Sequence, residues 1–235
     1  MYKYLLIILP TLVFSNPLEK SYDFITAIKD NELFFKDGSK LLYDDKIKKT
    51  LSQKIKNPDI EDMLFLKYSK NPSQRTDAGR IRNEVFFKKL YGKDREEIEK
   101  NLVPIRWLPK HTNITLLINK NEKCAEMLQK ISKELDNLPQ NYMKYIINPS
   151  GSYNYRHILG TNRLSAHSYG IAIDITSKYG NYWKWDKNFK YKNRIPLKIV
   201  NIFEKYGFIW GGRWYHYDTI HFEYRPELLQ NQVLN

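Results

Sequence analysis

Two short segments near the C-terminus place polar side chains inside runs that otherwise resemble buried strands. The first is SAHSYGIAID, residues 165–174, and the second is DTIHFE, residues 218–223. Residues 171–175 alternate and are β-branched, which predicts a strand with Asp174 on the face opposite Ile173 and Ile175. A carboxylate in such a run is costly unless it binds a cation or meets a polar partner. The fold therefore has to supply one of these.

The polar residues of the two segments match the needs of a hydrolytic zinc site. They comprise two histidines, His167 and His221, and two carboxylates, Asp174 and Asp218. Catalytic zinc takes three protein ligands and keeps a fourth position for water, and a nearby carboxylate can accept the proton of that water. The seven residues from His167 to Asp174 require a turn, which Gly170 permits. These segments together predict a metal centre.

The pattern SxHxxGxAxD followed by DxxHFE resembles the M15 group of zinc peptidases. That group includes D-alanyl-D-alanine carboxypeptidases, D,D-dipeptidases and phage L-alanyl-D-glutamate endolysins. The resemblance implies one Zn²⁺ per chain, bound by His167, Asp174 and His221, with Asp218 as the general base. It is most specific over residues 150–229, where WGGRWYHYDTIHFEYRPELL completes it, and it extends loosely back to about residue 75.

The resemblance also implies an arginine upstream of the first motif that polarises the scissile carbonyl. Tyr155-Arg156 matches this position, and Arg163 is the alternative. Ser165 is expected to bind substrate or to orient His167.

Two further residues of the second segment compete for these roles. His216 lies five positions before His221 and could act as a ligand, but we expect it to form part of the pocket wall or to support a ligand, because His221 already fills the ligand position. Glu223 could be mistaken for the general base. We expect it instead to be the structural partner of an arginine or a backbone amine.

The beginning of the chain is typical of a secretory signal peptide. Lys3 precedes an apolar run that is too short to cross a bilayer, and residues 13–15 offer a cleavage site before Asn16. We therefore expect residues 1–15 to be a signal peptide and the protein to be periplasmic or secreted. The alternative is an uncleaved anchor; no later stretch predicts a membrane span.

The composition is basic, which favours binding to anionic partners. The formal net charge is +13, and the basic residues are dispersed along the chain. This charge favours attraction to anionic envelope polymers. No nucleic-acid-binding motif is present, so nucleic acid is not expected as a partner. The single cysteine, Cys124, excludes an internal disulfide and is expected to lie in the core.

The predicted fold class is α+β, with a small, mainly antiparallel sheet that carries the zinc ligands and helices on one side of it. We expect a mostly helical N-terminal extension over residues 16–102 that packs against an M15-like peptidase domain over residues 103–235. Cap residues and periodicity predict helices over 59–66, 77–91, 94–102, 121–135 and 196–207, and strands over 114–118, 142–147, 208–210 and 219–224.

The sequence thus predicts a zinc peptidase that hydrolyses peptidoglycan stem peptides. Release of a terminal D-alanine by carboxypeptidase action is favoured, because arginine and lysine side chains near the cleft could hold a terminal carboxylate. Two alternatives stay open: a peptidoglycan endopeptidase of the same family, and a non-catalytic cell-wall-binding protein on the same scaffold.

Overall fold

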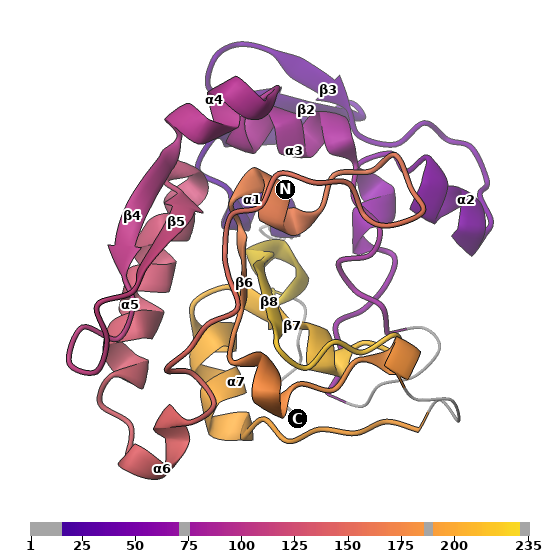
Figure 1. The fold of residues 1–235 in the computed structure, drawn as a ribbon. Helices are drawn as coiled ribbons and strands as arrows, with labels where there is room; N and C mark the ends of the chain where they lie inside the picture. Colours follow the sequence, from indigo (N-terminus) through magenta and orange to yellow (C-terminus); the bar gives the residue numbers. More distant parts are fainter. Residues whose placement is uncertain (1–15, 71–75, 186–189, 231–235) are drawn as a thin grey trace, which may run out of the picture.

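The computed structural model describes residues 16–70, 76–185 and 190–230. It combines short helices with small antiparallel sheets, which confirms the predicted α+β class. Figure 1 shows the sheet that carries the site near the centre of the molecule, with the N-terminal strands at the top of the view. Residues 1–15, and with them the expected signal peptide, lie outside the described residues.

The N-terminal extension begins with a helix and a three-stranded sheet. These elements are α1 (Pro17–Ser21), β1 (Ile25–Lys29), β2 (Glu32–Phe35) and β3 (Lys40–Leu42). The prediction of a mostly helical extension missed this sheet, whose strands are joined by turns at Asp30-Asn31 and at Gly38, all with positive φ. The helices that follow are α2 (Leu51–Lys56), the 3₁₀ helix η1 (Glu61–Leu64), α3 (Glu84–Tyr91) and α4 (Arg95–Lys100).

The rest of the chain forms two further sheets and their covering helices. A hairpin pairs β4 (Leu102–Arg106) with β5 (Thr115–Asn119), and η2 (Asn121–Lys123), α5 (Cys124–Leu135) and α6 (Gln140–Met143) follow. The site segments then form η3 (Ala166–Tyr169), β6 (Ala172–Asp174), η4 (Ser177–Tyr179) and η5 (Trp183–Trp185). The chain continues with α7 (Leu197–Lys205), β7 (Phe208–Trp210), η6 (Gly211–Arg213), β8 (His221–Tyr224) and η7 (Pro226–Leu228).

The central sheet is antiparallel with the strand order β6-β8-β7. Its register places Asp174 opposite His221 and Ile173 opposite Phe222. Because side chains alternate between the two faces of a strand, the polar pair and the apolar pair lie on opposite faces. One face of the sheet thus belongs to the core and the other to the site.

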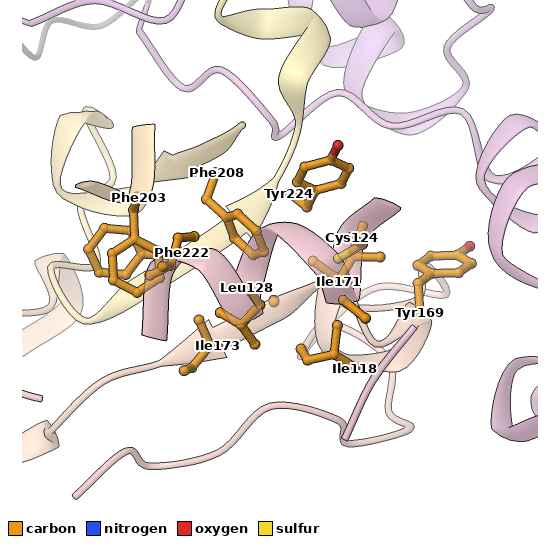
Figure 2. Packing of buried hydrophobic residues seen from close by; sticks show 14 of the residues in the cluster. Ile118, Cys124, Leu128, Tyr169, Ile171, Ile173, Phe203, Phe208, Phe222 and Tyr224 are labelled. Carbon is orange, nitrogen blue, oxygen red and sulfur yellow. The ribbon is translucent and has the colours of Figure 1, made fainter. Parts of the chain in front are cut away.

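The core face of this sheet packs against α5 and α7. Figure 2 shows Leu128 of α5 close to Ile173 and Phe222, with Phe203 of α7 beside Phe222. The rings of Phe203 and Phe222 stack with centroids 3.8 Å apart. Cys124 is fully buried here, as expected, and burial raises the pKa of its thiol well above the usual value. Burial of a phenylalanine side chain such as Phe203 or Phe222 contributes about 1.5–3 kcal/mol to stability.

The extension shares this hydrophobic core, as its predicted packing requires. Phe86 and Phe87 of α3 are fully buried, and the Phe87 ring lies 5.6 Å from that of Tyr169 in η3. At the other end of the core, the Tyr22 hydroxyl donates to Glu227, with an oxygen–oxygen distance of 2.6 Å. The expected division at residue 102 stays a prediction, because one core joins the two parts.

Several predicted elements are confirmed. Asp94 caps α4, and β5, α5, α7, β7 and β8 lie where the periodicity placed them. Three predictions were wrong. Residues 142–147 form the end of α6 and turns rather than a strand, and residues 59–66 contain only η1. Asp77 does not cap a helix, because α3 begins later and is capped by Asn83.

None of the helices within the described ranges has both the length and the apolarity needed to cross a bilayer.

Candidate functional site

Three side chains converge on the polar face of the central sheet. Nε2 of His167 lies 3.2 Å from Oδ1 of Asp174 and 3.2 Å from Nδ1 of His221, and the last two atoms are 2.9 Å apart. In a tetrahedral zinc site, bonds of about 2.0–2.2 Å separate neighbouring ligand atoms by about 3.3–3.6 Å. The three atoms therefore already have nearly the spacing that a zinc ion requires.

The sheet carries two of these three side chains. Asp174 ends β6 and His221 begins β8, whereas His167 lies on η3, so the expectation that the sheet would carry every ligand is corrected. The side chain of Ser165 caps η3 by accepting a hydrogen bond from the backbone amide of His167 at 3.4 Å. Ser165 therefore orients the short helix that presents His167.

The turn between His167 and Asp174 depends on Gly170. Its φ of +68° lies in the left-handed region, and a Cβ there would come within 2.5 Å of Leu102 and 3.1 Å of the Asn119 amide nitrogen. The hairpin of β4 and β5 thus packs tightly behind this turn. Any larger residue at position 170 would move the segment that joins His167 to Asp174.

Both histidines are oriented by a partner on the nitrogen that faces away from the cluster. Nδ1 of His167 lies 2.5 Å from the carbonyl oxygen of Ser152, which can only accept a hydrogen, so Nδ1 carries the proton. Nε2 of His221 donates to Glu223 at 3.2 Å. The remaining nitrogens, Nε2 of His167 and Nδ1 of His221, are the two that converge. Such outer partners fix the tautomer of metal-binding histidines.

Glu223 is held in turn by two buried arginines. Its carboxylate lies 3.3 Å from Arg82 and 3.4 Å from Arg225, and the side chain is 1 % exposed. Burial alone would raise its pKa, but the bond to His221 and the charges of the arginines lower the pKa to about 2. Glu223 is therefore an ionised structural partner, as expected, and not a base that is free to exchange protons.

The charges within the cluster suit a cation. Burial would raise the pKa of Asp174, but its close contacts with His167 and His221 hold that pKa well below its usual range. Burial would lower the pKa of His221, but its bonds to Asp174 and Glu223 raise it to about 10. Without a metal, a proton on His221 thus supplies the positive charge that the carboxylates require.

Asp218 lies beside this cluster and has different surroundings. Burial and the negative charge of Asp174 raise its pKa to about 6, although the charge on His221 opposes the shift. Its backbone is fixed, since its amide donates to Gly211 at 3.1 Å and it forms a bridge with Tyr182. The carboxyl is therefore a positioned group that can gain and lose a proton near neutral pH.

These residues line one cavity of about 350 Å³. All six residues predicted to bind zinc, act in catalysis or bind substrate line it: Arg156, Ser165, His167, Asp174, Asp218 and His221. One wall consists of residues from the segments 77–82 and 156–165, and another consists of residues from the segments 182–184 and 214–218. Arg163, the alternative to Arg156, lines the same cavity. Position alone therefore does not decide which of the two arginines polarises the scissile carbonyl.

The second wall contains His216, the histidine that could have acted as a metal ligand in place of His221. His216 lies outside the group of potential metal ligands found among the described residues, and it bonds Asp77 through both its ring and its backbone amide. Its ring also packs edge-on against Trp183, with centroids 4.6 Å apart. This confirms its expected place in the pocket wall. Trp214 lines the cavity as well, whereas Trp210 is buried in the core.

Sequence reasoning missed the contribution of the extension to the site. Asp77, Arg80 and Arg82 line the cavity, although they precede the first motif by more than eighty positions. Gly79 lies between them with φ +91°, and a Cβ there would come within 2.6 Å of the Glu223 carboxylate. No local pattern marks this segment, because its partners are distant in sequence. The role of the Ser152 carbonyl also has no side-chain signal.

The donor set fits a zinc ion. Two imidazole nitrogens and one carboxylate oxygen converge at near-tetrahedral spacing, and each imidazole has the outer partner that leaves the correct nitrogen available. Asp218 and the cavity lie beside them. His167, Asp174 and His221 could therefore hold a metal ion.

Comparison with known families agrees with this geometry. Residues 159–224 match the model of an M15 peptidase family described as D-alanyl-D-alanine carboxypeptidase. The matched region contains both motif segments and the three converging side chains, and it confirms the resemblance seen in the sequence. Comparison with curated proteins and with solved structures gave no match.

Proposed function

We propose that this chain, which matches an M15 peptidase family over residues 159–224, is a zinc-dependent enzyme that hydrolyses the stem peptides of peptidoglycan. We favour release of a terminal D-alanine. The observation that carries the proposal is the convergence of His167, Asp174 and His221 to within 3.2 Å of one another in a cavity that also contains Asp218.

The cavity itself supports a small peptide substrate. A volume of about 350 Å³ accommodates the end of a short peptide rather than a folded chain. Four arginines line it; Arg80 and Arg82 pair with carboxylates of the protein, and Arg156 and Arg163 favour a substrate with carboxylate groups. Stem peptides are short and carry such groups.

His167, Asp174 and His221 would hold the zinc ion. When bound, zinc supplies a Lewis acid that polarises the scissile carbonyl and makes water more acidic. Asp218 accepts the proton of the attacking water and passes it to the leaving amine, a role for which a pKa near neutrality is suited. Ser165 keeps His167 in place through the cap of η3.

Arg156 would stabilise the oxyanion that develops on the scissile carbonyl. Its backbone is fixed by Ser168: the Arg156 amide donates to Ser168 Oγ at 2.8 Å, and the Arg156 carbonyl accepts from the same hydroxyl at 2.6 Å. Its side chain is exposed and lines the cavity. A fixed backbone with a cationic side chain in the cavity is suited to electrostatic stabilisation of developing charge.

The setting that we propose is the cell envelope. Residues 1–15 would direct export, so that the mature protein would be periplasmic or secreted, and the net charge of +13 would attract it to anionic envelope polymers.

The test is mass spectrometry of tetra- and pentapeptide muropeptides after incubation with the zinc-loaded mature protein. Loss of one alanine supports the carboxypeptidase, and a larger split supports an endopeptidase of the same family. Binding without cleavage would indicate a non-catalytic cell-wall-binding protein, and cleavage of all-L peptides alone would overturn the substrate class. The Asp218→Asn variant controls for contaminating peptidases.

A further inference from the structure

The cavity wall formed by residues 77–82 and 156–165 carries an excess of positive charge. Arg82 lies 3.3 Å from Glu223 and Arg80 lies 3.1 Å from Asp77, so each of these two arginines has a carboxylate partner. Arg163 lines the same wall, and no carboxylate among the described residues comes within ion-pair distance of its guanidinium. Its charge is therefore not compensated by an ion pair with those residues.

The position of Arg163 is fixed by the backbone around it. The loop that carries it is closed by a bridge between His157 and Leu164, and the Arg163 carbonyl accepts from the Ile158 amide at 2.8 Å. Its Nη1 donates to the carbonyl of Arg80 at 2.9 Å. That bond joins the loop to the 77–82 segment and holds the guanidinium in the cavity wall.

The one nearby carboxylate is engaged elsewhere. Glu84 accepts from the Leu164 amide at 2.6 Å, and its other oxygen lies 3.8 Å from Lys88. Burial and the positive charges of Arg82 and Arg80 lower the pKa of Arg163 to about 10, so that it is still cationic at neutral pH. A half-buried cation among other cations is destabilising unless an anion compensates it.

We propose that Arg163 binds a carboxylate group of the peptide substrate and thereby selects anionic peptides. This inference rests on the proposed peptidase function and assigns the substrate class of the same cavity. The bond to Arg80 uses Nη1, and the edge formed by Nε and Nη2 is the one with which a guanidinium can bind a carboxylate through two parallel hydrogen bonds.

Arg156 and Lys184 are less suited to this role. Both are exposed, and the ammonium of Lys184 lies over the ring of Trp183, 5.4 Å from its centroid. Arg163 is half-buried, so its interaction with an anion is screened less by water.

A stem peptide with lysine at its third position, the type used for the test, offers two carboxylates to such a residue. One is the C-terminal carboxylate of the leaving D-alanine, and the other is the α-carboxylate of the γ-linked D-glutamate. The experiment therefore uses zinc-loaded protein and three substrates. These are the free-acid pentapeptide, its C-terminal amide, and the form with D-isoglutamine in place of D-glutamate. Each is assayed with wild type, Arg163→Met and Arg106→Met.

Arg106→Met is the matched control, because Arg106 is exposed on β4, bonds Asn113 and does not line the cavity. One of the two amide forms lacks the carboxylate that Arg163 binds. We expect the kcat/KM of wild type on that form to be about 10- to 100-fold lower than on the free acid, mainly because KM is higher. Arg163→Met should lose a similar factor on the free acid and little on that amide. The amide that responds identifies which carboxylate is bound.

Two kinetic outcomes would overturn the proposal. Equal cleavage of all three peptides by wild type means that no carboxylate is recognised. An equal loss by Arg163→Met on all three peptides means that Arg163 only supports its loop through the Arg80 carbonyl. Thermal unfolding of the variant, compared with that of Arg106→Met, verifies that it is folded.

Absence of cleavage by wild type would instead count against the proposed peptidase function. The inference is then decided by calorimetric binding of the same three peptides to the zinc-loaded protein. Discrimination between acid and amide that disappears in Arg163→Met supports it, and equal or absent binding of the acid and amide forms rejects it.

Discussion

Asp174 on β6 lies directly opposite His221 on β8, and Oδ1 of the first is 2.9 Å from Nδ1 of the second. The register of one strand pair thus places two of the three proposed ligands in contact. His167 approaches from η3 and completes the group. Because the opposite face of the same strands packs in the core, the stability of the sheet and the geometry of the site are coupled.

Removal of either histidine should abolish metal binding. We expect wild type to bind one zinc per chain, and His167→Ala and His221→Ala to bind none at near-stoichiometric protein and to unfold at a lower temperature, because metal binding is coupled to folding. Elemental analysis after desalting measures the metal, and calorimetry measures the unfolding. His216→Ala is the control and should keep its zinc. Full occupancy in both ligand variants would refute the assignment.

Zinc affinity should increase steeply with pH. The pKa of His221 is raised to about 10 in the metal-free protein, so zinc must displace its proton at neutral pH. The apparent affinity should therefore rise about tenfold per pH unit between pH 6 and 8, with release of about one proton per zinc. Titration calorimetry in buffers of different ionisation enthalpy measures this proton directly. An affinity that does not change over this range would contradict it.

The stability of the metal-free protein should depend on pH in the opposite direction and fall as pH rises. Because the folded-state pKa of His221 is raised above its unfolded value of about 6.5, its contribution is complete below that pH. It is lost as pH rises through about 10. Glu223→Gln removes one of the two carboxylate partners of His221 and should shift this loss to lower pH.

Asp218→Asn should keep the metal and lose turnover. The amide cannot accept a proton, so we expect kcat to fall by about 10²-fold or more with unchanged zinc content. In wild type, kcat/KM should rise with pH through a pKa at or below about 6, since the charge of zinc lowers the raised pKa of Asp218. Wild-type turnover in the variant would assign the base to another group.

Parts of this site could be predicted from sequence, and the reason differs between residues. Asp174 and His221 are identified because polar side chains are unusual inside apolar strands, whereas His167 and Asp218 are identified by the motif pattern and the family resemblance. The pairing of Asp174 with His221 could not be predicted, because it depends on the register of two strands that are distant in sequence. Asp77 illustrates the same limit: its local context indicates a helix cap, whereas its partner is His216, 139 positions away.

The errors in the fold have local causes. Residues 142–147 are a short apolar run, and periodicity alone cannot separate a strand from a helical turn at that length. The strands over residues 25–42 are joined by turns at Asp30-Asn31 and Gly38, residue types typical of hairpins, so this sheet could have been predicted from local sequence.

Arg156→Lys should reduce kcat more than it changes KM. Lysine keeps the charge but loses the planar fork, and the interaction with the scissile carbonyl strengthens only as charge develops on the oxygen. Steady-state kinetics on the pentapeptide separates the two parameters. Arg163→Lys is the comparison and should act mainly on KM. A fall of kcat in the Arg163 variant alone would show that the two roles are exchanged.

Gly79 connects the N-terminal extension to the metal centre, so its substitution should weaken zinc binding from outside the two motifs. Its φ is +91°, and a Cβ would come within 2.6 Å of the Glu223 carboxylate that orients His221. Gly38 is the matched control, because its φ is +79° and a Cβ there would meet nothing within 4 Å. Both glycine-to-alanine variants should lose about 1 kcal/mol of unfolding free energy from backbone strain.

Only Gly79→Ala should also lose zinc affinity, by about 10-fold or more, because displacement of Glu223 removes the outer partner of His221. Competition with a chromogenic chelator measures the affinity of both variants at one pH. Equal zinc affinity in the two variants, with equal losses of stability, would mean that the extension supports the fold without acting on the metal centre.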